Sequence, residues 1–247
     1  MSTAPARMHR DLVISAVLLV FTLAAASGGI DVVAYLRYDV FVANQTGNLV
    51  IISLGITQGD KSDPVLPSLV SLFAFMFAVF ATAAMRRWLT GRGWTDQKVR
   101  HRALMVEAIM LAIAAVLILI HADEHVQVRY GVIALLAVSQ GIQAVVLVRA
   151  LGVAVQTVAI NGPLVATLNM AAQGQRYRAL VAGAAPLGYA FGAGGGALLQ
   201  IVSSGLTLVV AASFGIAGVF LGQWYHDLEL KVKALDPPAG EATGPGG

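Results

Sequence analysis

Six long apolar runs constrain this chain of 247 residues more than any other feature of its sequence. Each run can cross about 30 Å of hydrocarbon as a helix that rises about 1.5 Å per residue. The six runs are 12–35, 67–88, 103–121, 130–150, 179–200 and 205–224. Only 12% of the residues are charged, whereas about a quarter are charged in a soluble domain. The sequence therefore predicts an all-α polytopic membrane protein.

Two further apolar stretches, 41–58 and 153–173, are interrupted at their centres. The interrupting residues are Asn44, Gln45, Thr46, Gly47 and Asn48 in the first stretch, and Asn161, Gly162 and Pro163 in the second. Backbone at membrane depth survives such a break only where protein or a cavity surrounds it. We therefore expect each stretch to carry a half-length helix, capped by Thr46 or Asn48 in the first and by Asn161 in the second.

The distribution of Lys and Arg favours re-entrant stretches over full crossings. If both stretches leave the membrane on the side that they enter, 13 of the 16 basic residues lie on the side of the N-terminus and 3 lie on the other. If both cross, the basic residues divide 8 and 8. Because short cytoplasmic loops are enriched in Lys and Arg, we predict six transmembrane helices plus two re-entrant, broken half-helix segments. Both termini are then cytoplasmic.

A weak internal repeat agrees with this topology. Ser27, Gly29, Asp31 and Arg37 align with Ser139, Gly141, Gln143 and Arg149 at a constant offset of 112 residues. Chance recurrence of small residues is the alternative explanation. If the repeat is real, each unit holds three spans and one broken segment, and the odd number of spans inverts the second unit, as in many transporters. The units of this 3+3 inverted repeat are about 12–121 and 130–225. We expect a cytoplasmic N-terminus at 1–11 and a cytoplasmic tail at 226–247, disordered from about 236, to flank them.

Two strings carry a resemblance to a known family. Gly28-Gly29-Ile30-Asp31 and Phe41-Val42-Ala43-Asn44-Gln45-Thr46-Gly47-Asn48 resemble the signature of the YoaK family (domain of unknown function 1275), and the similarity extends from the first apolar run to the last. The resemblance implies a multi-pass protein of the bacterial inner membrane. It implies no substrate and no catalytic residue. In the second unit, Asn161-Gly162-Pro163 departs from the threonine-glycine form of the first.

The broken segments also suggest a function. Half-helices whose N-termini point to the protein's centre present backbone donors there, which suits an anion or a polar solute. Our hypothesis is a small transporter or channel for a small polar or anionic solute, with its site at the midplane between the two broken helices. The candidate binding residues are Asp31, Asn44, Gln45, Thr46, Gly47, Asn48, Gln143, Asn161 and Gly162. The alternative is a membrane scaffold or lipid-binding subunit whose breaks are structural.

The acids inside or near the apolar runs allow several interpretations. Asp31 either faces a cavity or lies at the outer interface, and both interpretations stay open. We expect Arg37 to pair with Asp31 or Asp39. We expect Glu107 to reach towards the basic residues at the inner edge of its helix. For Gln143, the default role of an intramembrane amide is helix packing through hydrogen bonds.

Small residues recur every four positions in the fifth apolar run, at Ala184, Gly188, Gly192 and Gly196. This spacing places them on one helical face, where membrane helices approach each other closely. The neighbouring glycines do not form a nucleotide-binding loop, because no strand precedes them.

No arrangement of nucleophile, base and acid is visible, so we expect no enzyme activity, no cofactor and no metal. The segment 121–125, with its two histidines and two acids, is interpreted as a solvated loop. We expect membrane lipids as partners and no nucleic acid, because the basic residues lie in short segments between apolar runs. The sequence leaves open whether the chain forms a homo-oligomer.

Overall fold

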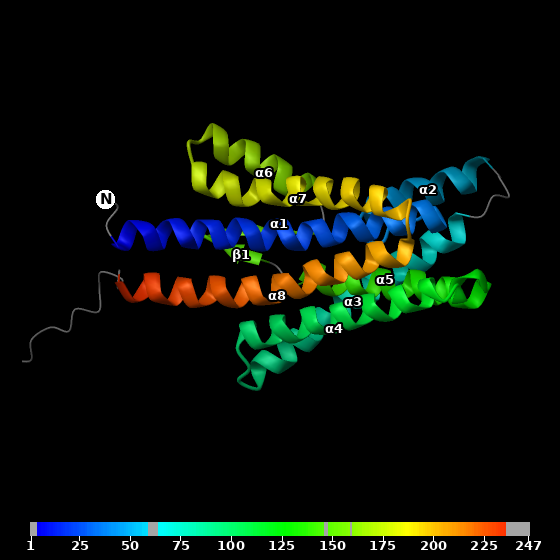
Figure 1. Ribbon diagram of the computed structural model, residues 1–247, viewed down its shortest axis with the longest axis horizontal. Helices are drawn as coiled ribbons and strands as arrows, with labels where there is room; N and C mark the ends of the chain where they lie inside the picture. Colours follow the sequence, from blue (N-terminus) through cyan, green and yellow to red (C-terminus); the bar gives the residue numbers. More distant parts are fainter. Residues whose placement is uncertain (1–3, 59–63, 146–147, 159, 236–247) are drawn as a thin grey trace, which may run out of the picture.

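The computed structural model describes residues 4–58, 64–145, 148–158 and 160–235, which form a bundle of long helices (Figure 1). The helices are α1 (Ala4–Tyr38), α2 (Gln45–Gln58), α3 (Val65–Gly91), α4 (Asp96–Leu119), the 3₁₀ turn η1 (Ala122–Glu124), α5 (Val126–Val145), α6 (Asn161–Ala172), α7 (Arg176–Gln200) and α8 (Ser204–Leu235). The strands are β1 (Val148–Ala150) and β2 (Val153–Val155). The disorder predicted from about residue 236 lies outside the described residues.

Five described helices, α1, α3, α4, α5 and α8, are long and apolar enough to cross a membrane. The chain is therefore a multi-pass membrane protein. The sixth expected span, α7, has 25 residues, which is long enough. Its six glycines and the internal Pro186 lower its hydropathy, so it is not among the five.

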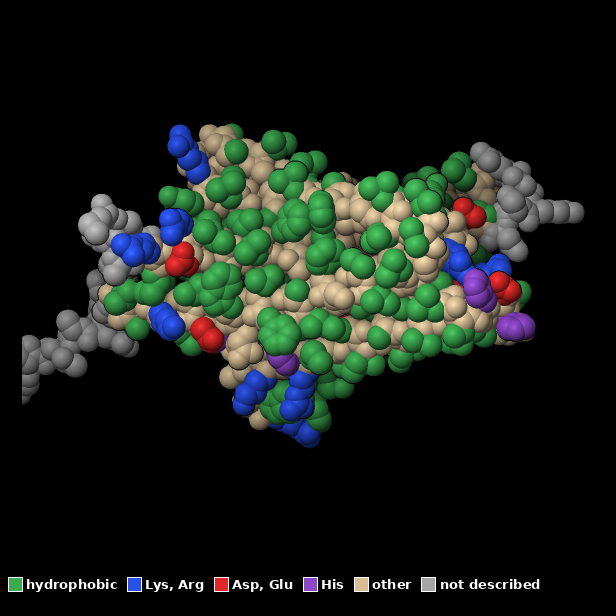
Figure 2. Space-filling model, viewed as in Figure 1, with side chains coloured by type: hydrophobic (Ala, Val, Ile, Leu, Met, Phe, Trp, Pro, Cys, Tyr) green, Lys and Arg blue, Asp and Glu red, His purple; other side chains and the backbone are tan. Residues whose placement is uncertain are grey.

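The distribution of side chains on the surface is the one expected of a membrane protein. On the face shown in Figure 2, apolar side chains cover the middle of the molecule. Lys and Arg side chains gather towards the end where α1 begins and α8 finishes, and around the turn between α3 and α4. We call this the basic end. Acidic and histidine side chains are prominent at the opposite end in this view.

The packing places the two half-length helices on the outside of the bundle. The helix α1 packs against α7 and α8, and α5 packs against α3 and α4. The helix α4 also packs against α8, while α2 lies on α3 and α6 lies on α7. In Figure 1, α2 and the start of α3 lie at the end where α1 finishes, and the turn between α6 and α7 lies towards the basic end.

The predicted caps of the half-length helices were wrong. The helix α2 begins before Thr46 and Asn48, so both residues lie in its first turn instead of preceding it. The helix α6 begins at Asn161, and the N-cap residue Ile160 makes no side-chain cap. Pro163 lies in the first turn of α6, where its missing N–H leaves no hydrogen bond unmade.

The expectation of a helix as far as residue 150 was also wrong. The helix α5 ends at Val145, and β1 pairs with β2 in a short antiparallel hairpin. Its turn residues Leu151 and Gly152 have φ values of 53° and 76°, both positive as a type I′ turn requires. The hydroxyl of Tyr225 in α8 accepts a hydrogen bond of 3.1 Å from the Leu151 N–H, which ties the hairpin to α8.

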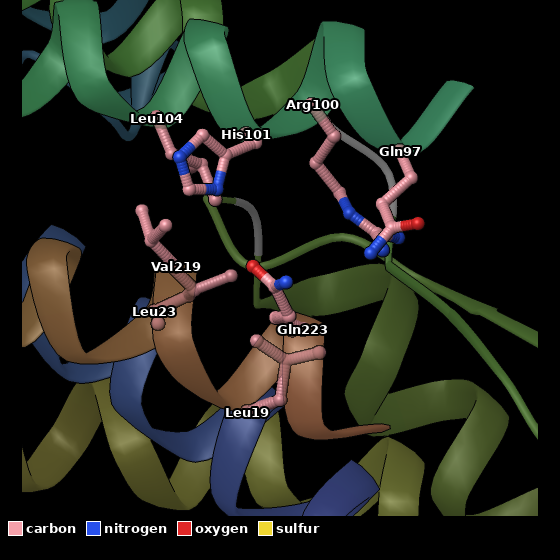
Figure 3. Close-up of a pocket in the computed structure, with 10 residues that line it drawn as sticks. Leu19, Leu23, Gln97, Arg100, His101, Leu104, Val219 and Gln223 are labelled. Carbon is pink, nitrogen blue, oxygen red and sulfur yellow. The ribbon is translucent and has the colours of Figure 1, made fainter. Parts of the chain in front are cut away.

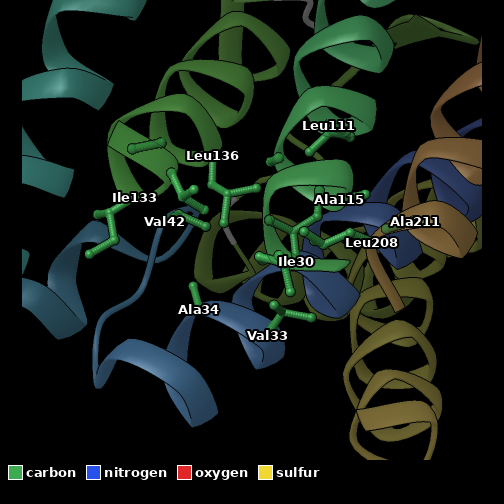
Figure 4. Packing of buried hydrophobic residues seen from close by; sticks show 14 of the residues in the cluster. Ile30, Val33, Ala34, Val42, Leu111, Ala115, Ile133, Leu136, Leu208 and Ala211 are labelled. Atoms are coloured by element: carbon green, nitrogen blue, oxygen red, sulfur yellow. The ribbon is translucent and has the colours of Figure 1, made fainter. Parts of the chain in front are cut away.

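The interior contains two apolar clusters. The first cluster lies towards the basic end and includes Leu19, Leu23, Leu104, Val181 and Val219. The second cluster (Figure 4) includes Ile30, Leu111, Ile133, Leu136 and Leu208. Along α4, the seven-residue step from Leu104 to Leu111 separates the clusters by about 10 Å.

Glycines bring α7 into backbone contact with α1. A Cβ atom added at Gly192 would lie 1.9 Å from the carbonyl oxygen of Ala25, and one added at Gly188 would lie 2.3 Å from that of Phe21. At Gly196 the added atom would lie 3.1 Å from the α1 backbone. The small-residue face therefore lies directly against α1, and this contact fixes the separation of the two helices.

We expect Gly192→Val to lower the thermal stability of the detergent-purified protein, because the added carbons overlap α1 and overpacking costs about 1–3 kcal/mol or more. The matched control is Gly194→Val, since a Cβ atom at Gly194 meets no atom within 4 Å. Equal melting temperatures for the two variants would contradict the close contact between α7 and α1.

Candidate functional site

The first broken segment is held by Asp31. This α1 residue is 2% exposed, and one of its carboxylate oxygens accepts hydrogen bonds from the N–H groups of Val42 and Ala43 at 2.8 and 2.7 Å. The other oxygen accepts from the Asn44 N–H at 3.1 Å and from the Tyr189 hydroxyl of α7. Asp31 therefore lies inside the protein, and it satisfies three backbone donors of the segment that precedes α2.

The buried amide of Asn48 closes the same segment from the other side. Its oxygen accepts from the Phe41 N–H at 2.9 Å, and its nitrogen donates to the Phe41 carbonyl at 2.6 Å and to the Gln45 side chain at 2.8 Å. The Ser71 hydroxyl of α3 also donates to the Phe41 carbonyl. A Cβ atom at Gly47 would lie 2.6 Å from the Phe41 ring. In the first break, these polar groups thus bind one another.

The second break is tied down by Gln143 of α5. Its side-chain nitrogen donates to the carbonyl of Leu23 in α1 and to the hydroxyl of Thr157, both at 2.9 Å. Asn161 and Gly162 are exposed at the start of α6. Within the described residues, no hydrogen bond joins the polar side chains of one break to those of the other.

Two other candidate residues, Asn44 and Thr46, are exposed at the start of α2. The Thr46 hydroxyl donates to the side-chain oxygen of Asn44 at 2.6 Å, and this pair is exposed. The nine predicted binding residues therefore separate into three places. Six belong to the first break and its anchor Asp31, Gln143 lies in the interior, and Asn161 and Gly162 lie at the α6 surface.

A polar layer separates the two apolar clusters. We define the central polar layer as Ser27, Glu107, Gln140 and Gln143, each at most 1% exposed. The carbonyl of Leu23 accepts from both Ser27 and Gln143, which places these two side chains together.

The positions of Glu107 and Gln140 along their helices place them at one level. Glu107 lies 12 residues before the end of α4, and Gln140 lies 14 residues after the start of α5. These helices adjoin and share one turn, so the two residues are about 18 and 21 Å from it.

Most polar groups of this layer lack a partner. Both carboxyl oxygens of Glu107, both amide atoms of Gln140 and the amide oxygen of Gln143 are buried and make no hydrogen bond to any described residue. Buried polar groups nearly always have a partner. An acid at membrane depth is costly, so it usually marks a functional site. The layer is therefore the strongest functional candidate in the described structure.

The expectation for Glu107 was wrong, because its side chain points into the core rather than to the basic inner edge. Leu104, Ala108 and Leu111 of α4 form a buried stripe, and Glu107 lies on it. An acid that continues an apolar stripe at helical spacing is a sequence signal for a buried carboxyl group.

Open space lies at the level of this layer. Gly215 of α8 is buried, yet a Cβ atom added there would meet no atom within 4 Å. Leu104 and Val219 line one pocket between α4 and α8, which sets the register of these helices. On α4, Glu107 comes three residues after Leu104. On α8, Gly215 comes four residues before Val219. The space is therefore within about 2 Å of the level of Glu107.

A polar cleft approaches the layer from the basic end. It has a volume of about 270 Å³ and lies between α3, α4 and α8. A smaller adjoining pocket (Figure 3) has Gln97, Arg100, His101 and Gln223 among its lining residues. Its apolar lining residues are Leu19, Leu23, Leu104 and Val219. Leu104 lies one helical turn from Glu107, so these apolar residues stand between the cleft and the layer.

Near the opposite end, the predicted partner of Arg37 was wrong. Arg37 pairs with Asp123, not with Asp31 or Asp39, and the Tyr38 hydroxyl donates to Asp123 at 2.7 Å. Asp123 is 2% exposed, so its segment is not simply a solvated loop.

Burial raises the pKa of the Asp123 carboxyl, but the hydrogen bonds from Arg37 and Tyr38 outweigh this effect and hold the pKa below its usual range. The described residues contain no group of three or more His, Asp or Glu that could hold a metal ion.

Comparison with known proteins gives one match. Residues 19–221 match the model of a family described as "Protein of unknown function (DUF1275)". No curated protein and no solved structure matches the chain.

We expect Asp31→Asn to lower the melting temperature strongly, because an amide offers fewer acceptor sites to the backbone donors and unpaired buried donors cost about 1–3 kcal/mol each. The matched control is Asp39→Asn, since Asp39 is exposed and its positive φ of 55° suits asparagine. Thermal unfolding in detergent measures both variants. An equal effect at the two positions would contradict the anchoring role of Asp31.

Proposed function

Because the chain belongs to the DUF1275 family, whose function is unassigned, we propose its function from its geometry: a small membrane transporter or channel for a small polar solute. Its binding site is the central polar layer. The observation that carries the proposal is the set of unpaired, buried polar groups of Glu107, Gln140 and Gln143. The open space at Gly215 supports it, because this space lies at the same level.

The proposed architecture is six transmembrane helices and two re-entrant segments in a 3+3 inverted repeat. The packing pairs support it. If α1–α4 are exchanged with α5–α8, the contact of α1 with α7 maps onto that of α5 with α3, and α1 with α8 maps onto α5 with α4. Likewise α2 on α3 maps onto α6 on α7, and α4 with α8 maps onto itself. Two inverted units related by a pseudo-two-fold axis produce this exchange.

The lengths of α2 and α6 support their re-entrant assignment. With 14 and 12 residues, they extend about 21 and 18 Å, less than the hydrocarbon thickness of about 30 Å. The long helix α7 completes the six spans. The basic end is then the cytoplasmic side, and the membrane is the bacterial inner (plasma) membrane with both termini in the cytoplasm.

The proposed route runs from the basic end through the polar cleft to the central polar layer. The apolar residues Leu23, Leu104 and Val219 close the layer on the cleft side, and the second cluster closes it on the other side. A site closed on both sides corresponds to an occluded state of alternating access. Transport then requires the helices to part on one side at a time.

The second candidate function is a non-transporting scaffold or lipid-binding subunit. The closed hydrogen-bond network of Asp31 and Asn48 favours it, because the first break then has a structural role. This candidate gives Glu107 no role. We therefore prefer transport, with the first break as the support of the site.

Because the chain contains no cysteine, single cysteines can report its topology. We expect Thr57→Cys, at the end of α2, to react with a membrane-impermeant maleimide from the same side as Asp39→Cys, which precedes α2 and is exposed. We expect Gln173→Cys, which follows α6, to react from the same side as Thr95→Cys between α3 and α4. Intact and inverted vesicles distinguish the sides. If Thr57→Cys reacts from the side opposite to Asp39→Cys, α2 crosses the membrane, and if Gln173→Cys reacts from the side opposite to Thr95→Cys, α6 crosses it; either result contradicts the re-entrant assignment.

We expect Gly215→Leu to abolish solute binding by filling the open space at the polar layer. The measurement is the thermal shift of purified protein across a panel of amines, amino acids, polyols, sugars and carboxylates, since a ligand that binds the folded state raises the melting temperature more as its concentration exceeds its Kd. Gly194→Leu is the matched control, with open space at an exposed position. A shift that survives in Gly215→Leu contradicts this site. No shift for any solute favours the scaffold.

A further inference from the structure

This inference deepens the proposed function and rests on it: we infer that the solute of the central polar layer is a small cation with N–H donors. A primary ammonium group fits this description, with the Glu107 carboxylate as its counter-ion. The polar side chains at this level are one acid, two amides and one hydroxyl.

The charges at the level of the layer disfavour an anion. Glu107 is the one ionisable side chain between residues 103 and 119 of α4. The segments 126–128 and 130–145 of α5, 179–200 of α7 and 204–225 of α8 contain no Lys, Arg or His. An anion at this level would meet a carboxylate and no countercharge, whereas a cation would gain one in a medium of low dielectric constant.

The nearest basic residues on α4 are directed elsewhere. Arg102 stacks over the ring of Trp94, with 4.3 Å between the guanidinium carbon and the ring centroid. Arg100 lines the polar cleft at the basic end. Leu104 lies between Arg100 and Glu107 along the helix, so the carboxylate is left without a cation from the described residues.

The backbone donors of the segment that precedes α2 already have a partner. The N–H groups of Val42, Ala43 and Asn44 donate to the carboxylate of Asp31. The protein therefore supplies its own anion at the first break. These three donors are not free to bind an anionic solute.

Four of the five unpaired groups of the layer are acceptors that match an ammonium group, and the fifth is the amide nitrogen of Gln140. Glu107 contributes two acceptor oxygens, and Gln140 and Gln143 contribute one each. A primary ammonium has three N–H donors, which three of these acceptors satisfy. Metal cations bound by oxygen commonly take six or more ligands, more than the layer offers. The observations therefore favour an ammonium over a bare metal ion.

The test uses currents from proteoliposomes adsorbed on a solid-supported membrane. Jumps in methylammonium, tetramethylammonium, sodium and potassium chloride are compared, together with exchange of chloride for acetate or phosphate at constant sodium. We expect the methylammonium response to exceed the tetramethylammonium response at least tenfold, because tetramethylammonium has no N–H donor.

Glu107→Gln should reduce the methylammonium current at least tenfold, because it removes the counter-ion. The control Glu124→Gln removes an exposed acid outside the layer and should change the current less than twofold. Glu107→Asp keeps the charge, so it should retain the current with a raised half-saturating concentration even if the glutamine variant folds poorly. Melting temperatures of all three variants report folding.

Three outcomes overturn the inference, and they differ in what they say of the proposed function. Acetate or phosphate currents that Gly215→Leu abolishes and Glu107→Gln spares would leave the transporter standing with an anionic solute. Sodium or potassium responses equal to that of methylammonium would replace the ammonium with a metal cation. Absence of any protein-dependent current and of any thermal shift would overturn the transporter as well.

Discussion

The hydrogen bonds between the Asp31 carboxylate and the backbone of residues 42–44 are the constraint on which the arrangement of the first half of the chain depends. Lipid offers no hydrogen bonds, so a chain that turns back within the membrane must find partners for its N–H groups inside the protein. Asp31 supplies them from α1, and Tyr189 links the same carboxylate to α7. One acid therefore holds the first break, α1 and α7 in one arrangement.

The two buried acids of the core, Asp31 and Glu107, differ in their hydrogen bonding. This difference distinguishes a structural residue from a candidate binding residue. Asp31 accepts four hydrogen bonds from protein donors, whereas Glu107 accepts none from the described residues. A polar network with all its hydrogen bonds made is rigid. A buried network with unpaired groups is costly unless a ligand supplies the missing partners. In the proposed transporter, the first break is therefore a structural support, and the central polar layer is the solute site.

Much of the fold follows from hydropathy and helical spacing, and much of the site does not. The long helices lie where the apolar runs are, and Gly188 and Gly192 lie at a helix contact, because these features depend on sequence neighbours alone. The β1–β2 hairpin was missed because an apolar run of valines is compatible with either a helix or a strand. Arg37 was assigned to a nearby acid, although its partner Asp123 is 86 residues away.

By itself, the sequence determined the class of the protein, the positions of its long helices and the two interruptions, because each depends on the length and hydropathy of a local segment. Only the tertiary structure decided which polar groups are satisfied. Asp31 and Tyr189 are 158 residues apart, and Gln143 and Leu23 are 120 apart. A hydrogen bond forms between atoms that the fold brings within about 3 Å, so whether an intramembrane acid is an anchor or a binding group depends on the packing of distant helices.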